Sequence, residues 1–365
     1  MTDNSKTHIL IIELKGIGNT ACIIPLLKYI DNNNNYIFDL IVSNNGSDEL
    51  IDVFKYSNLK NIIIWDIHKS YINNLFSISK IIREYHYDIA IATYPSGAKE
   101  VILLYVAKSK VKKILRNKGG YIRFLQFLFS NAPMANQDIH EVENNAILFG
   151  VPVEHLRNKK IIYNIDKIKI GIHIGSKGIN RRWDISNWVE LIRILKSKYN
   201  AIIYLIAGNN EKQLINEIIS SVEVDDLLIG MKFEELLRNI EKLTLLIGND
   251  SSIAHISALL NIPTVVIWSY SQYRRISPYG KGTVIITHDY DCIPCYNVTN
   301  KYIDKCKYNF RCIKNTKVND VSQILNIYIE SLKSKKLPDE SKYKEMESLS
   351  KIETLAWGTK ILYLK

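Results

Sequence analysis

Short apolar runs alternate with longer amphipathic stretches along most of the chain, and this alternation predicts the fold. In the first half, runs rich in Ile and Val predict strands at residues 9–14, 37–43, 62–65 and 89–93. None of these runs alternates strictly between apolar and polar residues, which is typical of strands buried on both faces of a parallel sheet. A glycine-containing turn and a helical stretch follow the first run, as expected of a strand–helix unit.

The same order of strand, turn and helix begins again at residue 168. Apolar runs predict strands at 168–174, 201–207, 243–247 and 264–268, and helices are expected at 186–199 and 211–221. Two rounds of alternation predict two doubly wound α/β domains. We expect an N-terminal domain at 1–160, a C-terminal domain at 168–335, and a tail at 336–365 whose folding the sequence leaves open.

The composition fits a folded protein of two domains with an anionic partner. The chain has 365 residues, of which 47% are hydrophobic, enough for two cores of ordinary size. Its 48 Lys and Arg exceed its 37 Asp and Glu, and the net charge of +11 favours partners that carry phosphates or carboxylates. No apolar run approaches the roughly 20 residues that cross a bilayer, and the start lacks a secretory signal. We therefore expect a cytoplasmic protein whose five cysteines are not structural disulfides.

The first predicted strand ends in a glycine turn that opens a helix. Gly16, Gly18 and Asn19 belong to this turn, which fits the pattern in which a helix N-terminus faces an anion. The fit is incomplete, because Pro25 falls early in the helix and only Asp39 lies near the position of the expected acidic residue. A turn that serves strand–helix packing alone is the alternative.

A second turn, at residues 175–178, follows the first strand of the second half. Ser176 supplies a hydroxyl donor there, and the adjacent Arg181 and Arg182 supply forked guanidinium groups that suit phosphate oxygens. The alternative is a solvated basic loop.

The third turn, at residues 249–252, joins a buried strand to a helix. Asp250, Ser251 and Ser252 lie where the first-turn N–H groups are unpaired and the helix dipole is positive, so a diphosphate can bind there. His255 lies one turn further along, placed to donate a hydrogen bond to a phosphate or ribose. The alternative is that Asp250 or Ser251 only caps the helix and that His255 is a core histidine.

Five ordered stretches resemble the heptosyltransferase family, glycosyltransferase family 9. They are a glycine loop with a Pro-bearing helix, an acceptor-side strand and loop, a His-x-x-Glu helix, a basic-Arg-Trp turn and the Asp-to-His block, at residues 16–27, 87–99, 140–143, 181–183 and 247–268. The resemblance spans residues 9–328. It implies a GT-B fold, in which two Rossmann-like domains face a central cleft, the first binding the acceptor and the second the donor nucleotide.

The resemblance also implies an activity and a set of site residues. The activity is a glycosyltransferase that moves a heptose from ADP-heptose onto a lipopolysaccharide core or another surface glycan; a protein acceptor of the autotransporter type and a catalytically weak nucleotide-sugar-binding homologue are the alternatives. The implied donor-binding residues are Ser176, Arg181, Arg182, Gly208, Asn210, Met231, Asp250, Ser251, Ser252 and His255. The implied acceptor-binding residues are Gly18, Asn19, Ser96 and Lys99, with Asn19 and Asp250 as catalytic positions.

Asn19 departs from the family pattern, which has an Asp at this position as the candidate general base. An amide does not accept a proton from an acceptor hydroxyl. Either another carboxylate such as Glu13 serves, or the acceptor is positioned without a strong base, or activity is lost. We favour the second, because sugar transfer depends heavily on stabilising the leaving diphosphate.

Four cysteines, Cys292, Cys295, Cys306 and Cys312, lie in one loop-like stretch at 290–313. Their spacing in a cytoplasmic protein favours a structural Zn or Fe site with four thiolate ligands, and the resembling family includes members with an iron-bound cysteine finger. A closed four-thiolate shell leaves no open position, so we expect no catalytic metal. Free thiols and two disulfides are the alternatives.

A basic stretch at 108–123, followed by apolar residues up to 129, is interpreted as a surface for an anionic, lipid-linked acceptor. A solvated helix face beside a core helix is the alternative. We expect peripheral contact with the inner membrane and no nucleic-acid partner. The sequence leaves the oligomeric state open.

Two other classes of protein remain open. A nicotinamide dehydrogenase that uses the Gly16 turn is disfavoured, because the strongest anion-binding turns lie in the second half. A non-enzymatic basic binding module is disfavoured, because the residues of the donor site keep their chemistry.

Overall fold

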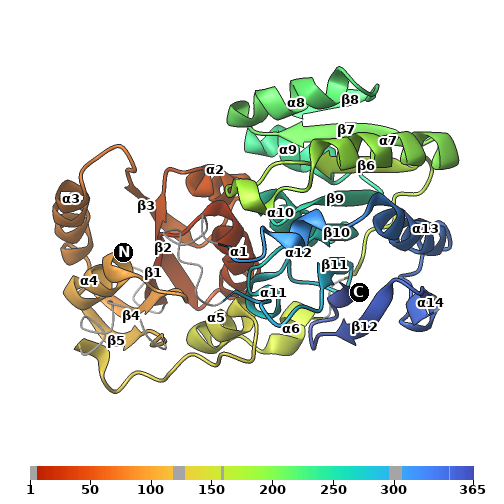
Figure 1. The fold of residues 1–365 in the computed structure, drawn as a ribbon. Coiled ribbons are helices and arrows are strands. Elements are labelled where there is room, and N and C mark those ends of the chain that lie inside the picture. Colours follow the sequence, from red (N-terminus) through yellow and green to blue (C-terminus); the bar gives the residue numbers. More distant parts are fainter. Residues whose placement is uncertain (1–5, 118–127, 158–159, 296–305, 345) are drawn as a thin grey trace. The chain divides into compact units, whose positions relative to one another are not determined.

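The computed structural model describes residues 6–117, 128–157, 160–295, 306–344 and 346–365 (Figure 1). The chain forms two compact units, unit 1 (Met1–Leu156) and unit 2 (Arg157–Lys365). Each unit has its own sheet, which confirms the predicted pair of α/β domains. The division falls a few residues before the boundary expected from the sequence.

Unit 1 is built on a five-stranded parallel sheet in the order β3-β2-β1-β4-β5. Its strands are β1 (Thr7–Glu13), β2 (Tyr36–Ser43), β3 (Leu59–Trp65), β4 (Tyr87–Ala92) and β5 (Ser109–Lys113). Its helices are α1 (Ile17–Asp31), α2 (Ser47–Val53), α3 (Tyr71–Arg83), α4 (Ala98–Val106) and α5 (Glu141–Phe149), with α6 (Val153–Arg157) at the boundary. Helix α1 contacts α2 and α5, whereas α3 contacts α4.

The core of unit 1 lies where the central strands meet α3 and α4. Leu10 and Ile12 of β1 belong to one buried cluster with Ile41 of β2, Ala90 of β4 and Ile78 of α3. Since β1 is paired on both edges and covered on both faces, its apolar residues are buried in succession. This explains why the sequence shows a continuous apolar run there.

The basic stretch at 108–123 does not begin as a helix face. Its first part forms the edge strand β5, where charged side chains are common because they discourage pairing with other chains. Lys110 pairs with Asp88 at 2.6 Å, and Lys112 Nζ lies 5.6 Å from the centre of the Tyr105 ring. Residues 118–123 of the stretch lie outside the described residues.

Unit 2 is built on an eight-stranded sheet in the order β12-β13-β11-β10-β9-β6-β7-β8, parallel except for the β12–β13 pair. Its strands are β6 (Lys169–His173), β7 (Ile202–Ala207), β8 (Asp226–Ile229), β9 (Leu245–Asn249), β10 (Thr264–Ile267), β11 (Thr283–His288), β12 (Leu349–Thr354) and β13 (Lys360–Leu364). Its helices are η2 (Ile179–Arg181), α7 (Ile185–Tyr199), η3 (Asn209–Glu211), α8 (Lys212–Ile219), α9 (Phe233–Ile240), α10 (Ser252–Leu259), α11 (Tyr273–Ile276), α12 (Arg311–Lys314), α13 (Val318–Lys333) and α14 (Ser341–Lys344).

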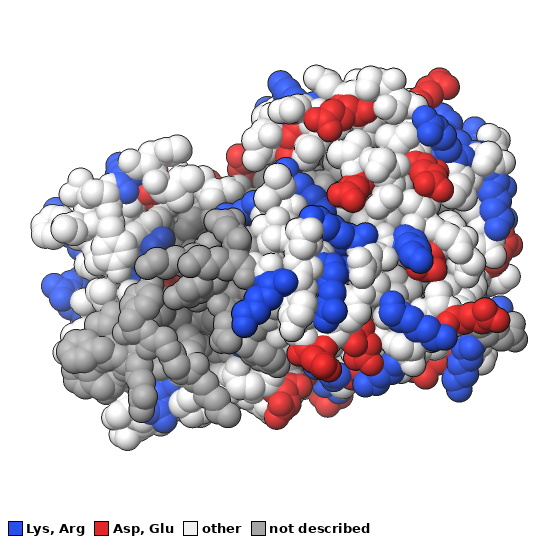
Figure 2. All heavy atoms as spheres, viewed as in Figure 1, with Lys and Arg blue, Asp and Glu red and all other residues white. Residues whose placement is uncertain are grey.

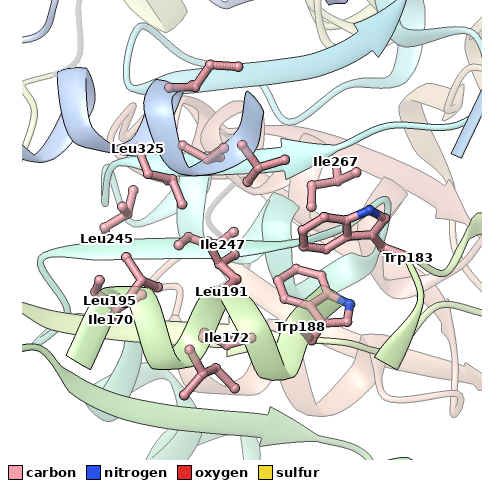
Figure 3. Close-up of a cluster of buried hydrophobic side chains, with 14 of the residues drawn as sticks. Ile170, Ile172, Trp183, Trp188, Leu191, Leu195, Leu245, Ile247, Ile267 and Leu325 are labelled. Carbon is pink, nitrogen blue, oxygen red and sulfur yellow. The ribbon is translucent and has the colours of Figure 1, made fainter. Parts of the chain in front are cut away.

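The core of unit 2 lies between the sheet and the helices α7 and α13 (Figure 3). Trp183 and Trp188 are buried there with their rings edge to face, 5.0 Å between centroids. Full burial of an apolar side chain of this kind contributes roughly 2 kcal/mol. The Trp183 indole N–H also donates to the Thr316 carbonyl oxygen at 2.8 Å. This packing anchors the chain directly after the two arginines of the second turn.

The segment 336–365, whose folding the sequence left open, is part of unit 2. Strand β13 pairs in parallel with β11, and β12 pairs antiparallel with β13. Ile361 and Leu362 are fully buried in this arrangement. The apolar end of the chain folds back because it supplies a strand whose backbone groups pair on both edges.

Candidate active site

The strand order of unit 2 reverses beside β6, and the predicted donor residues gather at that point. From β6 the chain runs outward to β7 and β8, and then returns to β9 on the other side of β6. Open parallel sheets bind ligands outside the carboxyl ends of the strands at such a reversal. Ser176 follows β6 and Asp250 follows β9, so both residues lie at this edge of the sheet.

Asp250 holds the segments around this edge together. Its side chain accepts hydrogen bonds from Arg181 Nη1 at 3.1 Å and from Ser271 Oγ at 2.7 Å, and the residue is only 6% exposed. Its backbone carbonyl oxygen accepts a hydrogen bond from Ser176 Oγ at 2.9 Å. We call these four residues the Asp250 network. Asp250 therefore fixes a guanidinium and two hydroxyl groups instead of capping α10.

The two adjacent arginines have different partners. Arg181 donates from Nε to the Tyr270 hydroxyl at 3.3 Å, and its guanidinium carbon lies 5.3 Å from the centre of the Tyr270 ring. Arg182 donates from Nε and Nη2 to the Ser176 carbonyl oxygen at 3.0 and 2.8 Å. Because a carbonyl oxygen carries no net charge, this contact does not neutralise Arg182, whose positive charge acts on the nearby Glu211 carboxylate and attracts anions at this edge.

Helix α10 begins at Ser252, directly after the Asp250 network. Its N-cap residue, Ser251, makes no side-chain cap, and the Ser251 hydroxyl is buried without a partner among the described residues. Uncapped first-turn N–H groups at the positive end of a helix favour an anion. Burial lowers the pKa of His255, and the Asp250 carboxylate opposes this only in part, so the imidazole is neutral at pH 7.

Glu211, which the sequence analysis missed, lies beside the same edge. Its Oε2 accepts a hydrogen bond from the Gly208 N–H at 2.9 Å and lies 3.6 Å from His173 Nε2. Burial alone raises the pKa of Glu211, but its interactions with His173 and Gly208 outweigh burial, so the pKa is lowered and the carboxylate is ionised at neutral pH. A Cβ at Gly175 would lie 1.7 Å from Glu211 Oε1, so this glycine makes room for the carboxylate. The sequence signal that could have identified Glu211 is an acidic residue three positions after Gly208, the glycine at the end of β7.

The remaining predicted donor residues lie at the next two strand ends. Gly208 and Asn210 follow β7, and Met231 follows β8. Met231 Sδ accepts a hydrogen bond from Asn239 Nδ2 at 3.7 Å. The structure thus places all three at the same edge as the Asp250 network, one and two strands beyond β6.

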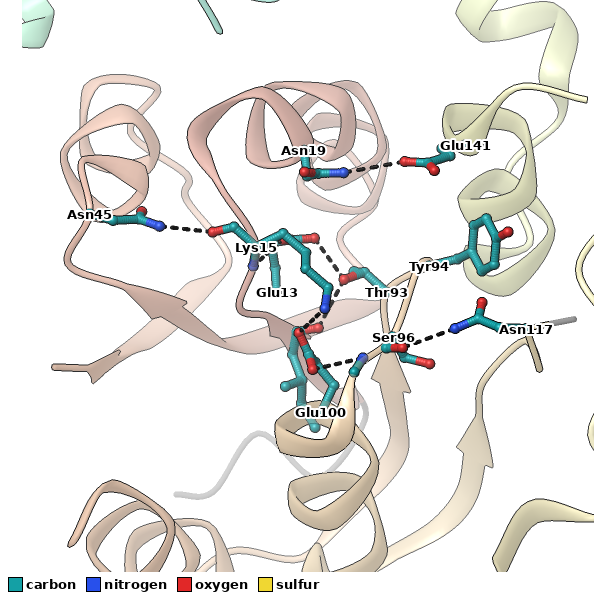
Figure 4. A network of polar contacts seen from close by, with 12 residues as sticks. Glu13, Lys15, Asn19, Asn45, Thr93, Tyr94, Ser96, Glu100, Asn117 and Glu141 are labelled. Atoms are coloured by element: carbon teal, nitrogen blue, oxygen red, sulfur yellow. Dashed lines mark hydrogen bonds and ion pairs between the residues drawn. The ribbon is translucent and has the colours of Figure 1, made fainter. Parts of the chain in front are cut away.

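Unit 1 has its own strand reversal, between β1 and β4, and a polar network occupies that point (Figure 4). Glu13, the last residue of β1, accepts hydrogen bonds from Thr93 Oγ1 at 2.6 Å and from the Lys15 N–H at 2.9 Å. Burial raises the pKa of Glu13 to about 7, although both hydrogen bonds lower it. The side chain ties the end of β1 to the end of β4 and to the glycine turn.

A second buried carboxylate, Glu100 on α4, belongs to the same network. Its Oε2 accepts a hydrogen bond from the Gly97 N–H at 2.9 Å, and its Oε1 lies 3.1 Å from Lys15 Nζ. Charge repulsion from Glu100 also raises the pKa of Glu13, whereas the positive charge of Lys15 lowers it. Lys15 thus pairs with Glu100 through its ammonium group and contacts Glu13 through its backbone N–H.

Asn19, predicted at the acceptor site, is held by a carboxylate. Gly18 and Asn19 lie in the first turn of α1, and Asn19 Nδ2 donates to Glu141 Oε2 at 3.2 Å. Glu141 is the first residue of α5 and is buried. Sequence spacing gave no sign of this pair, because 122 positions separate the two residues.

The other two predicted acceptor residues follow β4. The Ser96 hydroxyl is buried without a partner among the described residues, and its carbonyl oxygen accepts a hydrogen bond from Asn117 Nδ2 at 3.0 Å. Lys99 Nζ lies 4.6 Å from the centre of the Trp65 ring, so a cation–π contact holds its charge. The structure therefore gives Ser96 an unused donor and directs Lys99 toward Trp65.

The four cysteines predicted as metal ligands are free thiols, and residues 296–305 between them lie outside the described residues. Burial, together with the nearby thiols of Cys306, Cys295 and Cys292, raises the pKa of Cys312 to about 12. Within the described ranges, no three His, Cys, Asp or Glu side chains are placed to hold one metal ion. The Cys295 N–H donates to the carbonyl oxygen of Tyr270 at 2.8 Å, so this loop adjoins a residue that contacts Arg181.

Surface charge and helix hydropathy bear on the predicted partners. On the face drawn in Figure 2, Lys and Arg side chains are interspersed with Asp and Glu over unit 2. A nucleic-acid surface is typically a stripe of one sign, and this face of unit 2 is mixed. In the part of the chain that the structure describes, no helix is both long and apolar enough to pass through a bilayer.

Two α/β units, each built on a largely parallel sheet with a strand reversal, are the arrangement of GT-B glycosyltransferase folds. The family model for glycosyltransferase family 9 (heptosyltransferase) matches residues 75–305, well over half of the chain. The chain belongs to this family.

Individual relatives agree with the family assignment. The lipooligosaccharide heptosyltransferase 2 of Campylobacter jejuni is 29% identical over 150 residues, which cover 39% of this chain and 46% of that protein. The lipopolysaccharide heptosyltransferase 1 of Campylobacter coli is 26% identical over 181 residues, which cover 47% of this chain and 50% of that protein. The chain spans about half the length of these curated relatives in the matches.

Solved structures share the fold at low sequence identity. The heptosyltransferase WaaC of E. coli, solved with ADP, has a TM-score of 0.67 and 16% identity, covering 88% of this chain and 99% of that one. The dodecameric iron-containing heptosyltransferase TibC of enterotoxigenic E. coli has a TM-score of 0.56 and 13% identity, covering 90% of this chain and 77% of that one. These similarities establish the GT-B fold.

Proposed function

We propose that the protein transfers a heptose from ADP-heptose to a lipopolysaccharide core or another surface glycan. The observation that carries the proposal is the Asp250 network at the β6–β9 reversal, in a chain of glycosyltransferase family 9. WaaC was solved with ADP and with ADP-2-deoxy-2-fluoro heptose, and TibC with ADP-D-beta-D-heptose. Those ligands support the same class of donor here.

The geometry suits stabilisation of a leaving diphosphate. When the bond between the anomeric carbon and the diphosphate breaks, negative charge collects on the phosphate oxygens. The uncapped amides of α10, the Ser251 hydroxyl and the Arg182 guanidinium are donors at one edge of the sheet. Preorganised donors of this kind contribute about 100- to 1000-fold each. We expect them to do so without a catalytic metal.

Nucleotide binding and product mass test the proposal. ADP should raise the melting temperature of the protein more than UDP, GDP or NADH, because ligand at 100 times its Kd stabilises the folded state by about 2.7 kcal/mol. Incubation with ADP-heptose and a truncated lipopolysaccharide acceptor should give a product heavier by one heptose in mass spectrometry. Stabilisation by NADH alone would favour a dehydrogenase, and no response to any nucleotide would favour a binding module; either result rejects the proposal.

The acceptor and cellular location are part of the proposal. We propose an anionic glycolipid or glycan as the acceptor, a cytoplasmic protein, and peripheral contact with the inner membrane. The net charge of +11 supports an anionic partner. The described part of the basic stretch contributes little to this support, because Lys110 and Lys112 already have partners within unit 1. TibC is dodecameric. We propose, on the basis of the shared fold, that this chain also self-assembles.

We further propose a structural Zn or Fe ion held by Cys292, Cys295, Cys306 and Cys312. The nearness of their thiols supports it: burial and the neighbouring thiols raise the pKa of Cys312, and a bound cation would favour the thiolate instead. A four-thiolate shell would be architectural.

Metal content tests this site directly. Protein purified without chelator is expected to carry about one Zn or Fe per chain by elemental analysis, and Cys312→Ser is expected to lose it. The matched control is Cys22→Ser, which removes a thiol from unit 1 and should leave metal content unchanged. Substoichiometric metal in the unmodified protein rejects the site.

A further inference from the structure

We infer that Glu141 accepts the proton of the acceptor hydroxyl and that Asn19 positions it. The inference rests on the proposed transferase function. In the step it describes, the acceptor oxygen bonds to the anomeric carbon of the sugar. The bond from that carbon to the diphosphate breaks, the diphosphate leaves with the electron pair, and the hydroxyl proton passes to the Glu141 carboxylate.

Three carboxylates lie around the strand reversal of unit 1 (Figure 4). Glu13 is 1% exposed, and both of its oxygens accept hydrogen bonds from the protein. Glu100 is also 1% exposed, with one oxygen bound to the Gly97 N–H and the other paired with Lys15. These two groups serve the internal network that joins β1, β4 and α4, whereas Glu141 is 7% exposed.

Glu141 is held from both sides of the reversal. From the β1 side, Asn19 Nδ2 donates to Glu141 Oε2 at 3.2 Å. From the β4 side, Asn145 accepts from the Tyr94 N–H at 2.7 Å and donates to the Tyr94 carbonyl oxygen at 2.8 Å, and its Nδ2 also donates to the Glu141 carbonyl oxygen at 3.0 Å. Helix α5 is thereby fixed to the end of β4, and its first residue meets the glycine turn after β1. Rigid support of this kind is what a reacting group needs.

Glu141 and Asn19 divide the work of base and support. Glu141 lies in the first turn of α5 and carries a carboxylate, the group that can take a proton. The Asn19 amide donates to its Oε2 and so fixes the direction of the carboxylate. Asn19 itself offers no basic atom. The amide therefore orients the base.

An exchange of side chains separates proton transfer from structural support. Glu141→Gln keeps a side-chain oxygen for the Asn19 amide but removes the base, so kcat is expected to fall at least 100-fold with the ADP-induced rise in melting temperature unchanged. Adding Asn19→Asp to this variant returns a carboxylate to the same pair, and we expect at least a tenfold recovery of kcat. Asn19→Asp alone places two carboxylates together, and one of them must hold a proton.

The matched control is Glu49→Gln, which changes an exposed acid in the first turn of helix α2 of the same unit and should alter kcat less than threefold. If Glu141→Gln does not fold, Glu141→Asp replaces it, because withdrawing the carboxylate by one methylene should still lower kcat at least tenfold. A kcat within threefold of the original for either Glu141 variant, or a loss that Asn19→Asp does not recover, overturns the inference. Absence of ADP binding in the unmodified protein would instead overturn the proposed function.

Discussion

Replacing Asp250 by Asn is expected to lower kcat/KM for the sugar donor by about 100- to 1000-fold. The substitution keeps an oxygen for the Ser271 hydroxyl. It removes the negative charge that holds Arg181, whose Nη1 lies 3.1 Å from Asp250 Oδ2. Asp250 is buried, so water does not take its place, and the contact with Tyr270 then remains among the described residues to position the Arg181 side chain. The donors at the β6–β9 reversal then lose their preorganised geometry.

Steady-state kinetics with varied donor concentration measure this effect, and thermal unfolding shows whether the variant stays folded. Asp226→Asn is the control, since Asp226 is an exposed carboxylate on β8 of the same unit. Arg181→Ala should cause a loss of similar size, and the double variant should be little worse than either single one, because both remove the same contact. Additive losses would show that Asp250 and Arg181 act separately, contrary to our account of the network.

Glu13→Gln is expected to remove a pH dependence of stability worth roughly 3 kcal/mol. Burial raises the pKa of Glu13 from 4.5 to about 7, so between these values the folded state holds a proton that the unfolded state has lost. The favourable contribution of protonated Glu13 is fully present below pH 4.5 and is lost as the pH rises through 7. A neutral glutamine keeps its contribution at every pH, since its oxygen can accept from the Lys15 N–H and its amide can donate to Thr93.

Urea unfolding at pH 5 and pH 8 tests this sign. At pH 5 the two proteins should differ little, and at pH 8 Glu13→Gln should be the more stable by roughly 3 kcal/mol. Glu84→Gln changes an exposed acid of unit 1 and should show no such difference between the two pH values. If Glu13→Gln instead lowers the free energy of unfolding by the same amount at pH 5 and at pH 8, the buried carboxylate is ionised, contrary to its raised pKa.

The alternation of apolar runs predicted most of the sheet correctly. The strands expected at 9–14 and 168–174 correspond to β1 and β6, and those expected at 243–247 and 264–268 to β9 and β10. These are central strands, where burial on both faces leaves a continuous apolar sequence. Strands β5 and β12 were missed because edge strands carry charges, as in the Ser109–Lys113 segment with its three lysines. Strand β8 was missed because it is an edge strand whose first two residues are exposed. Strand β11 was also missed although it is buried, and β13 lies in the segment whose folding the sequence left open.

The candidate donor site was predictable in part, because turns after parallel strands meet at one edge of a sheet. Ser176 and Asp250 were identified from their own turns, and the strand order then brings them within hydrogen-bond distance. Glu211 was not identified, because in sequence it is only an acid near the start of a helix. Its role as the neighbour of Gly175 depends on how β6 and β7 pair.

The sequence by itself determined eight of the strands, among them the central strands β1, β6, β9 and β10, and it determined where the glycine turns fall and which side chains those turns carry. These properties depend on residues within a few positions of one another, so local patterns encode them. Only the tertiary structure decided that Arg181 meets Asp250, 69 positions away, and that Asn19 meets Glu141, 122 positions away. Such contacts follow from the order in which strands join the sheet, and that order is set by the packing of the whole unit, which no short stretch of sequence contains.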